Sequence, residues 1–482
     1  MTAFCHGVAS ADPLPDGVVL WTRCTTGGTE PVAVDWWIGT AADEVVARGT
    51  AEASPHRDFT VHVDVRGLEP ATAYRYGFTY GDERSPVGRS RTAPAPYGPD
   101  AHLRLGLVSC SYWSCGFFNA YANLATRDVD LVVHVGDYIY ENDIMSRSPR
   151  AVRAHRPAGR LLALEDYRAR YAQYRTDPDL QALHAAHPVA TVWDDHELAG
   201  GTWRGGAGAH DPEWLGPWEL RRAAAVQAYR EWMPMRRPGP ESVYRALQLG
   251  PLADLVLLDT RVIGRDEPVL NSDRPVIKVR PEPRSLLGDE QWRWLEGRLS
   301  SSGSRWLLVA NQVMMAPLRA LNVAGGLGVN AGQWDGYPAE RERFYALLQR
   351  TGWGSDAAVL TGDVHSSWAA DLPVGAEFVT PSVTTDSFSR TVFPPVPGLS
   401  AVARRIFLSQ NRHMRFADLD HHGYVTVDVT PERLQADWWH LDTIARRPSG
   451  ERWAGGWSLV HGELGLRRAG APAASVAGEL AH

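Results

Sequence analysis

The first 94 residues carry short hydrophobic segments separated by turn residues at close intervals. Segments rich in Val, Ile, Trp and Thr, a composition typical of β-strands, occupy residues 17–22, 32–38 and 59–65. Several short strands at this spacing are typical of a β-sandwich. We therefore predict a small all-β domain over residues 1–94, followed by a proline-rich linker at 94–99.

The hydrophobic pattern changes after this linker. Continuous apolar runs, typical of buried strands, now alternate with longer segments of helical character. The predicted strands are 103–110, 130–137, 188–193, 252–258, 305–309 and 357–360, and the predicted helices are 116–127, 164–187 with a possible break at Pro178, 219–232, 289–299 and 339–350. Such alternation predicts an α/β domain.

The end of the chain differs again. Strand-like composition returns at residues 423–439, and we assign residues 102–445 to the α/β domain. From residue 446 the chain turns polar and then rich in Ala and Gly. We therefore predict a C-terminal tail over residues 446–482 with a loose end.

Composition excludes several classes of protein. The chain has 482 residues, 44% hydrophobic and 22% charged, which excludes a small disulfide-stapled scaffold, a fibrous repeat and a disordered chain. The net charge of −7 argues against a nucleic-acid-binding surface but not against a small phosphorylated substrate. Walker A, nucleophile-elbow and His-Glu-x-x-His motifs are missing, so the kinase, serine hydrolase and zincin classes have no support.

The sequence gives no sign of a membrane anchor. No segment reaches about 18 consecutive apolar residues, so we expect no transmembrane helix. The chain does not start with a basic region followed by an apolar one. We therefore expect a cytoplasmic protein, or an exported protein whose signal has been trimmed.

Four cysteines are present, at positions 5, 24, 110 and 115, and none forms a Cys-x-x-Cys pair. A structural zinc knuckle is therefore not expected. Cys5 and Cys24 flank a predicted turn at residues 13–17. They could face each other as a disulfide, or they could be two buried thiols.

Polar side chains that can bind metal follow the central predicted strands. The candidates, in chain order, are Cys110, Asp137, Tyr140, Asp194, Asp195, His196, Asn311, Asp363 and His365. In open α/β sheets, ligands bind outside the carboxyl ends of the strands. Each residue alone has an ordinary structural explanation, such as a helix cap or a core histidine. Together they predict one metal-binding cleft.

The sequence resembles the PhoD-type alkaline phosphatases, within the calcineurin-like metallophosphoesterase and purple acid phosphatase superfamily. The segments that carry the resemblance are residues 4–10, 20–23, 136–141, 193–197, 258–261, 311–313, 334–337, 360–368 and 422–424. The resemblance implies a metallophosphoesterase β-sandwich flanked by helices. Residues 67–76 resemble part of a fibronectin III domain, which implies a fibronectin III-like all-β N-terminal domain. Gly200 and Gly201 depart from the family pattern, in which asparagines are expected.

The resemblance implies two metal sites that share Asp137. The first has Cys110, Asp137, Tyr140 and His365 as ligands. Ionising a tyrosine at pH 7 costs roughly 4 kcal/mol, so a strongly charged ion is needed, and ferric iron is expected with zinc as the alternative. The second has Asp137, Asp195, Asn311 and Asp363, which offer oxygen only. Oxygen ligands favour calcium, magnesium or manganese, and calcium is the family expectation. The role of Asp194 stays open.

The function implied is hydrolysis of phosphoric esters, as an alkaline phosphatase or phosphodiesterase. A dinuclear Fe3+/Ca2+ centre would activate water for in-line attack on a small phosphate-ester substrate. We expect His196 to act as a general acid or charge stabiliser, the alternative being a purely structural hydrogen bond. Arg261 could clamp the phosphate, or form a buried ion pair with Asp259.

Two other functions are compatible with the sequence. A phospholipase D-type lipid phosphodiesterase, which family relatives include, would need an apolar approach surface, and the sequence shows no evident amphipathic lid. A non-catalytic binding protein would use the fibronectin-like domain. The complete set of predicted ligands argues against that function.

Overall fold

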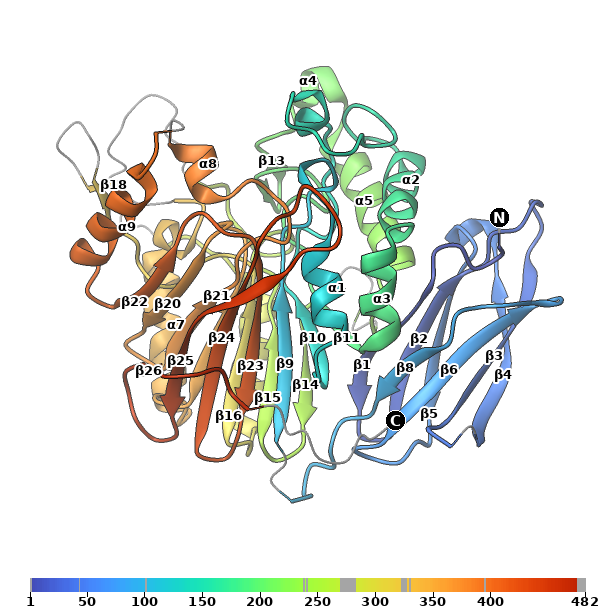
Figure 1. The fold of residues 1–482 in the computed structure, drawn as a ribbon, viewed down its shortest axis with the longest axis horizontal. Coiled ribbons are helices and arrows are strands. Elements are labelled where there is room, and N and C mark those ends of the chain that lie inside the picture. The colour runs from blue at the N-terminus through green and yellow to red at the C-terminus, as the bar shows by residue number, and fades with distance from the viewer. Residues whose placement is uncertain are drawn as a thin grey trace.

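The computed structural model describes residues 2–42, 44–99, 102–236, 239, 242–268, 283–321, 327–328, 331–393 and 396–474. Two large sheets dominate this part of the chain (Figure 1). The ten-stranded sheet has the order β26 (Arg467–Ala469), β25 (Glu451–Val460), β24 (Arg433–Leu441), β23 (Gly423–Val429), β9 (Leu103–Val108), β10 (Leu131–His134), β11 (Val189–Thr191), β1 (Val8–Leu14), β2 (Gly17–Arg23) and β5 (Thr60–Arg66). The seven-stranded sheet has the order β14 (Arg245–Leu249), β15 (Ala253–Leu257), β16 (Trp306–Asn311), β19 (Ala357–Thr361), β21 (Ala376–Val379), β20 (Ser367–Asp371) and β22 (Met414–Asp418).

The remaining elements are helices, short hairpins and a third sheet. The helices are α1 (Asn119–Ala125), α2 (Leu164–Arg175), α3 (Pro178–Ala186), α4 (Pro212–Leu215), α5 (Trp218–Trp232), α6 (Gly288–Ser301), α7 (Pro338–Arg350), α8 (Phe388–Val392) and α9 (Leu399–Gln410), with 3-10 turns η1 (Pro55–Arg57), η2 (Trp113–Cys115), η3 (Ile144–Arg147) and η4 (Trp334–Gly336). The third sheet contains β4 (Val45–Ala53), β3 (Val32–Thr40), β6 (Ala73–Tyr80), β7 (Glu83–Arg84) and β8 (Gly88–Arg91). The hairpins pair β12 (Thr202–Trp203) with β13 (Gly206–Ala207) and β17 (Ala320–Leu321) with β18 (Leu327–Gly328).

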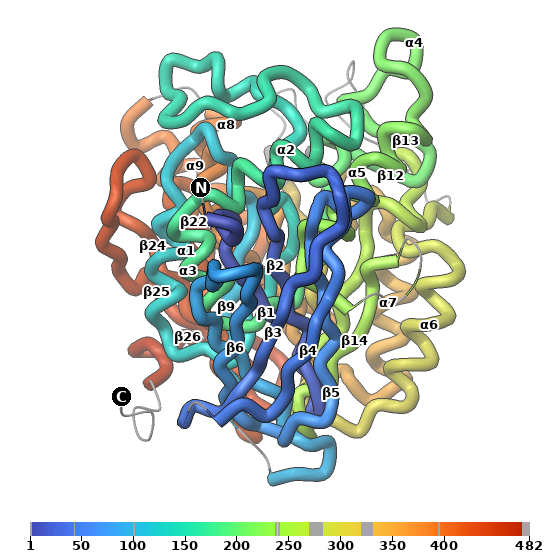
Figure 2. Tube along the Cα trace, turned by 90° about the vertical axis from the view of Figure 1, so that its right-hand side faces the viewer, coloured from blue at the N-terminus to red at the C-terminus, as the bar shows by residue number. Residues whose placement is uncertain are grey.

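The two large sheets pack face to face with helices on their outer sides. Leu308 of β16 belongs to the core shared with the ten-stranded sheet, whereas its neighbours Leu307 and Val309 pack with α6 and α7. Successive strand residues point to opposite faces, so this alternation places a core on each side of the sheet. Figure 2 shows α6 and α7 on one side of the sheets and α1 and α3 on the other. The predicted β-sandwich flanked by helices is confirmed.

The N-terminal region forms the predicted all-β unit. Three of its strands, β1, β2 and β5, belong to the ten-stranded sheet. A separate core lies between β1, β2 and β5 on one side and β3, β4 and β6 on the other, and it includes Leu20 and Ile38. β1 also pairs with β11, with Ala11 opposite Val189. Hydrogen bonding therefore joins this unit to the α/β region across the sheet.

The predicted break in the long helix is confirmed. α2 ends at Arg175 and α3 begins at Pro178. The Asp177 side chain accepts hydrogen bonds from the backbone N–H groups of Asp179 and Leu180. Proline fits the first helical position, where its missing N–H costs nothing, and the aspartate caps the exposed N–H groups.

The predicted C-terminal tail over residues 446–482 contains two strands of the ten-stranded sheet, β25 and β26. β25 pairs with β24 along its whole length, and β26 pairs with β25. Glycine and arginine lower the strand propensity of this segment, but ladder hydrogen bonds to a formed sheet outweigh that preference. Residues 475–482 lie outside the described residues.

The structure also tests the predictions about the cysteines and about a transmembrane helix. Cys5 and Cys24 are free thiols, so the disulfide alternative is wrong. The Cys5 Sγ atom lies 3.3 Å from Thr25 Oγ1. None of the described helices combines the length and apolar character needed to cross a membrane.

A buried ion pair joins the N-terminal unit to the seven-stranded sheet and predicts a large effect on stability. Arg245 Nη2 lies 2.6 Å from Asp12 Oδ1, with both side chains buried. Asp12→Asn leaves the arginine without a charge partner, so the free energy of unfolding should fall by about 3 kcal/mol. The exposed pair of Arg66 and Asp16 at 3.2 Å is the matched control, and Asp16→Asn should cost less than about 1 kcal/mol. Urea denaturation followed by tryptophan fluorescence measures both, and equal effects would contradict the prediction.

Candidate metal centre

The predicted metal-binding side chains follow strands whose carboxyl ends lie together. β9, β10 and β11 pair in parallel, as do β15, β16 and β19 in the facing sheet. Parallel strands end at one edge, so the segments that follow them converge. These segments contain every predicted site residue: Cys110, Asp137, Tyr140, Asp195, His196, Arg261, Asn311, Asp363 and His365.

The first donor group consists of Cys110, Asp137, Tyr140 and His365. Ligand atoms of Cys110, Asp137 and His365 all lie within 4.8 Å of one another. The Tyr140 hydroxyl donates a hydrogen bond of 2.7 Å to Asp137 Oδ2. All four residues predicted for the first metal site are therefore adjacent, and Cys110, Asp137 and Tyr140 are buried.

The second donor group consists of Asp194, Asp195 and Asp363, whose carboxylate oxygens also lie within 4.8 Å of one another. Asp195 forms a further cluster with Asp137 and His196, so the two donor groups are contiguous. The structure thus places Asp194, which the sequence left open, among the oxygen donors of the second group.

Arg261 supplies the positive charge at the second donor group. Its Nε donates to Asp194, and its Nη2 lies 2.5 Å from Asp363 Oδ1 and 3.8 Å from Asp195 Oδ1. The Asp259 carboxylate instead accepts hydrogen bonds from the backbone N–H groups of Arg261 and Val262, both at 2.8 Å. The predicted alternative of an Arg261–Asp259 ion pair is therefore wrong, because two carboxylates closer to the guanidinium group take that role.

Asn311 lies at the end of β16 and is fully buried. Its amide oxygen accepts a hydrogen bond of 3.1 Å from Trp334 Nε1, and its amide nitrogen donates to the Val313 carbonyl and to Thr361 Oγ1. An amide oxygen has two lone pairs, so Trp334 leaves one lone pair available for a cation.

Several donor residues adopt backbone conformations that side chains rarely allow. Cys110, Asp137, Asp363 and His365 have φ angles of 62°, 56°, 62° and 50°. They make up half of the eight non-glycine residues with positive φ in the described part of the chain. Each such residue costs roughly 1–3 kcal/mol and persists only where the surroundings enforce it, typically at functional sites.

The protonation of the first donor group fits a cation site. Burial raises the pKa of the Cys110 thiol, the Asp137 carboxyl and the Tyr140 hydroxyl well above their usual values. The Asp137 charge raises the pKa of the other two further. A bound cation would offset the cost of ionising these groups, and its binding would release protons.

The second donor group also fits a cation. Asp194 Oδ2 and Asp195 Oδ1 are buried carboxylate oxygens without a hydrogen-bond partner in the described part of the chain. Unsatisfied buried oxygens are unfavourable unless a ligand occupies them. Hard oxygen donors of this kind match the coordination preferences of calcium, magnesium and manganese.

The sequence interpretation missed the partner of His196. Its Nδ1 lies 2.6 Å from Glu141 Oε2, and both residues are adjacent to the first donor group. Burial opposes the charged imidazolium, but the carboxylates of Glu141 and Asp137 outweigh burial and raise the pKa of His196 well above its usual value. Glu141 belongs to the family-like segment 136–141, but its spacing from His196 gave no sign of a contact.

Glu197 is a second residue whose role was missed. Its carboxylate accepts backbone hydrogen bonds from Asp137 at 3.0 Å, Tyr138 at 2.7 Å and Asp194 at 2.8 Å. Burial raises its pKa to about 8. One side chain thereby holds two strand-end loops at a fixed separation.

The two glycines that depart from the family pattern also contact this region. The backbone N–H groups of Gly200 and Gly201 donate to Glu141 Oε1 and Asp195 Oδ2 at 2.9 and 2.5 Å. A Cβ at Gly200 would lie 3.1 Å from His196 Cε1. A larger side chain at position 200 would therefore crowd the imidazole ring.

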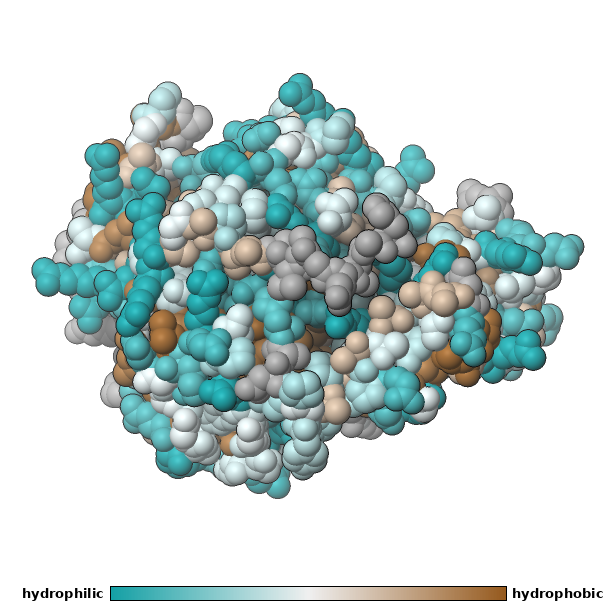
Figure 3. Space-filling view, turned by 60° about the horizontal axis from the view of Figure 1, so that its bottom comes forward, coloured by the Kyte–Doolittle hydropathy of each residue, from teal (hydrophilic) through white to brown (hydrophobic). Residues whose placement is uncertain are grey.

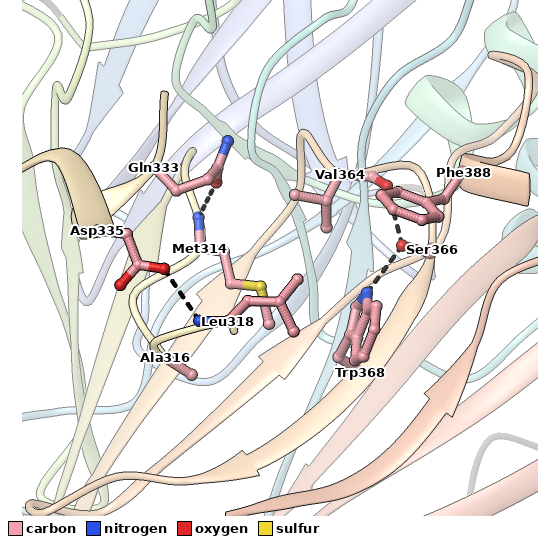
Figure 4. A pocket seen from close by; sticks show the side chains of 9 residues that line it. All are labelled: Met314, Ala316, Leu318, Gln333, Asp335, Val364, Ser366, Trp368 and Phe388. Carbon is pink, nitrogen blue, oxygen red and sulfur yellow. Dashed lines mark hydrogen bonds between the residues drawn. The ribbon is translucent and has the colours of Figure 1, made fainter. Parts of the chain in front are cut away.

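Two further features lie close by. A cavity of about 20 Å3 is lined mainly by apolar side chains, including Met314, Val364 and Trp368 (Figure 4). Gln333, which also lines it, donates a hydrogen bond to Asp363. A cavity of this size holds about one water molecule, so it is not itself a site for a phosphate ester. Separately, Asp418, His421 and His440 form another cluster, in which His421 Nδ1 lies 2.9 Å from Asp418 Oδ1.

The fold and the two donor groups define a class: α/β proteins that gather metal-binding side chains at the carboxyl ends of their strands. The chain belongs to the PhoD-like phosphatase family. The family's main domain, described as "PhoD-like phosphatase", matches residues 105–438, and its N-terminal domain matches residues 1–94.

Two relatives support this assignment over most of the chain. Alkaline phosphatase D of Bacillus subtilis (strain 168) is 38% identical over 469 residues, covering 90% of this chain and 77% of that protein. The solved structure of PhoD is similar with a TM-score of 0.87 at 35% identity, covering 97% of this chain and 92% of that one. The protein is therefore a phosphoesterase, and the alternative of a non-catalytic binding protein is wrong.

Proposed function

We propose that the protein hydrolyses small phosphate esters at a dinuclear centre that holds ferric iron and calcium. The observation that carries the proposal is the position of Asp137. It clusters with Cys110 and His365 on one side and with Asp195 on the other. One carboxylate can therefore reach a metal in each donor group.

The two donor groups differ in a way that supports two different metals. A thiol, a phenol and an imidazole surround Asp137 on the first side. Ionising a buried phenol needs a highly charged partner, which favours ferric iron over zinc. The second side offers only carboxylate oxygen, from Asp194, Asp195 and Asp363, which supports calcium. The amide oxygen of Asn311 is a further proposed ligand.

The residues around the centre have distinct roles in this proposal. When bound, the two cations would lower the pKa of a coordinated water and stabilise charge on the phosphoryl oxygens. His196, kept protonated by Glu141, donates a proton to the leaving oxygen. Arg261, beside Asp194 and Asp363, binds a phosphate oxygen of the substrate.

Calcium dependence tests the oxygen-only side. Chelation should abolish hydrolysis of a chromogenic phosphomonoester and phosphodiester and lower the melting temperature, because a ligand at 100 times its Kd stabilises the folded state by about 2.7 kcal/mol. Calcium should restore both better than zinc does. Asp195→Ala should lose this response, whereas Asp418→Ala, in the separate cluster, should keep it. Full activity of a calcium-free, zinc-only preparation would disprove the assignment.

Removal of the proposed acid should reduce turnover without loss of metal. His196→Ala should lower kcat by roughly 100- to 10,000-fold while elemental analysis finds both metals. Glu141→Gln should lower kcat less, because the imidazole remains. His102 lies 2.6 Å from Asp428 in a similar pair remote from these residues, so His102→Ala is the control with unchanged kcat. Loss of a metal from the His196 variant would show that this histidine is a ligand instead.

Iron in the first donor group should make the protein coloured. Phenolate and thiolate bound to ferric iron absorb visible light by charge transfer, whereas zinc, with a filled d shell, does not. Tyr140→Phe and Cys110→Ser should each weaken or shift the band, by different amounts. A visible spectrum with elemental analysis measures this. A colourless, fully active enzyme with stoichiometric zinc and no iron would disprove the iron assignment but not phosphoesterase activity.

A further inference from the structure

An exposed apolar surface lies on the segment from Phe388 to Arg412. Four large hydrophobic side chains of this segment are exposed: Val392, Val396, Val402 and Ile406, at 54%, 57%, 51% and 38%. Val402 and Ile406 are one turn apart on α9 and therefore share a face. We call this set of four side chains the apolar rim.

The apolar rim does not result from a poorly packed helix. Phe407 of α9 is buried, with ring contacts to Trp368 and Phe388 at centroid distances of 6.0 and 5.9 Å. α9 therefore packs on the core with one face and exposes apolar side chains on another. A helix that is apolar beyond its buried face has surface available for a partner.

The charge of this segment is opposite to that of the whole protein. Residues 387–412 contain Arg390, Arg404, Arg405 and Arg412 and no Asp or Glu, although the chain has a net charge of −7. Arg390 lies 3.5 Å from Asp386. The other three arginines make no ion pair with an acidic side chain in the part of the chain that the structure describes. Basic residues beside exposed apolar ones complement an anionic, partly apolar partner.

The segment is attached directly to the metal centre. The Phe388 backbone N–H donates to the His365 carbonyl at 3.2 Å, and those of Thr384 and Thr385 donate to the Cys110 carbonyl at 3.2 Å. α8 lies at the same end of the molecule as α4 (Figure 1). The opposite end, brought forward in Figure 3, shows a mostly hydrophilic surface.

We propose that the described residues 388–393 and 396–412 dock the protein onto the surface of an anionic phospholipid layer. Val402 and Ile406 enter the boundary between headgroups and acyl chains, while Arg404, Arg405 and Arg412 contact the lipid phosphates. α4 carries the exposed Trp214 at the same end, but Asp211 and Glu213 beside it repel an anionic surface, so the basic side makes the contact. Docking presents the metal centre to phosphate esters held in the layer, a consequence that rests on the proposed function.

Cosedimentation of the full chain with vesicles tests the docking. The protein should bind equimolar phosphatidylglycerol and phosphatidylcholine vesicles, bind phosphatidylcholine vesicles weakly, and lose affinity as salt rises. Each arginine near an anionic surface contributes roughly fivefold in affinity. The exposed pair Arg405→Glu/Arg412→Glu should therefore weaken binding by at least about 25-fold. Val402→Ser/Ile406→Ser should weaken it by at least about tenfold.

A matched control comes from two exposed valines on β4. Val45 and Val46 are 50% and 46% exposed in the N-terminal unit, and Val45→Ser/Val46→Ser should bind vesicles like the wild type. Equal binding of both vesicle types, or unchanged binding by the arginine pair variant, would overturn the proposal. A dimer that forms without lipid and that Val402→Ser/Ile406→Ser dissolves would identify a second copy as the occupant and overturn it too.

Hydrolysis of a soluble chromogenic ester separates this inference from the proposed function. All three double variants should hydrolyse that ester at the wild-type rate, because none of the changed residues belongs to either donor group. Vesicle binding by a wild-type protein that is inactive on every ester would contradict the proposed function only. Activity on soluble esters without vesicle binding would contradict the docking only.

Discussion

The crowding of acidic side chains at one strand edge is the constraint on which the rest of the structure depends. Six carboxylates converge there: Asp137, Glu141, Asp194, Asp195, Glu197 and Asp363. Arg261 and His196 contact these carboxylates and supply positive charge, but too little to neutralise all six if every one is ionised. Burying unpaired carboxylates is strongly unfavourable. A fold that places these groups together therefore needs either cations or proton uptake, and burial raises the pKa of Asp137 well above its usual value.

Such a cluster keeps its shape only if the backbone around it is rigid. Glu197 supplies one restraint, because its carboxylate holds the loops after β10 and β11 through three backbone hydrogen bonds. The sheets supply another, because parallel pairing fixes where each strand ends. Against this frame, Cys110 and Asp137 can be held at positive φ, which aims their side chains at the same point. The repulsion between donors is thus balanced by hydrogen bonds made elsewhere, which is the preorganisation that a metal site needs.

The sequence predicted the parts of the structure that depend on local pattern. Apolar runs and turn residues identified most strands and helices, and the polar residues that follow them identified both donor groups. Contacts between residues far apart in the chain were beyond that reasoning. Glu141 and His196 are 55 positions apart, and the choice of Asp194 over Asp259 by Arg261 depends on distances in the folded state. β25 has little strand character alone and forms by pairing with β24. The sequence did not indicate that α9 has an exposed apolar face. Phe407 and Ile406 are both apolar, and they differ only in that Phe407 is buried and Ile406 is exposed.

The metal centre and the apolar rim share one short piece of chain. Residues 383–388 leave the sheet, donate backbone hydrogen bonds to Ser109, Cys110 and His365, and then enter α8. These bonds hold Phe388 next to the first donor group, and the Phe388 ring packs on Phe407 of α9 at a centroid distance of 5.9 Å. The directions in which α8 and α9 present their exposed residues are therefore tied to the donors. A surface held in this way cannot tilt independently of the cleft. A phospholipid layer that contacts the apolar rim therefore has a fixed distance and orientation relative to the two donor groups. The hydrogen bonds that shape the metal centre thus also determine how a bound surface faces it.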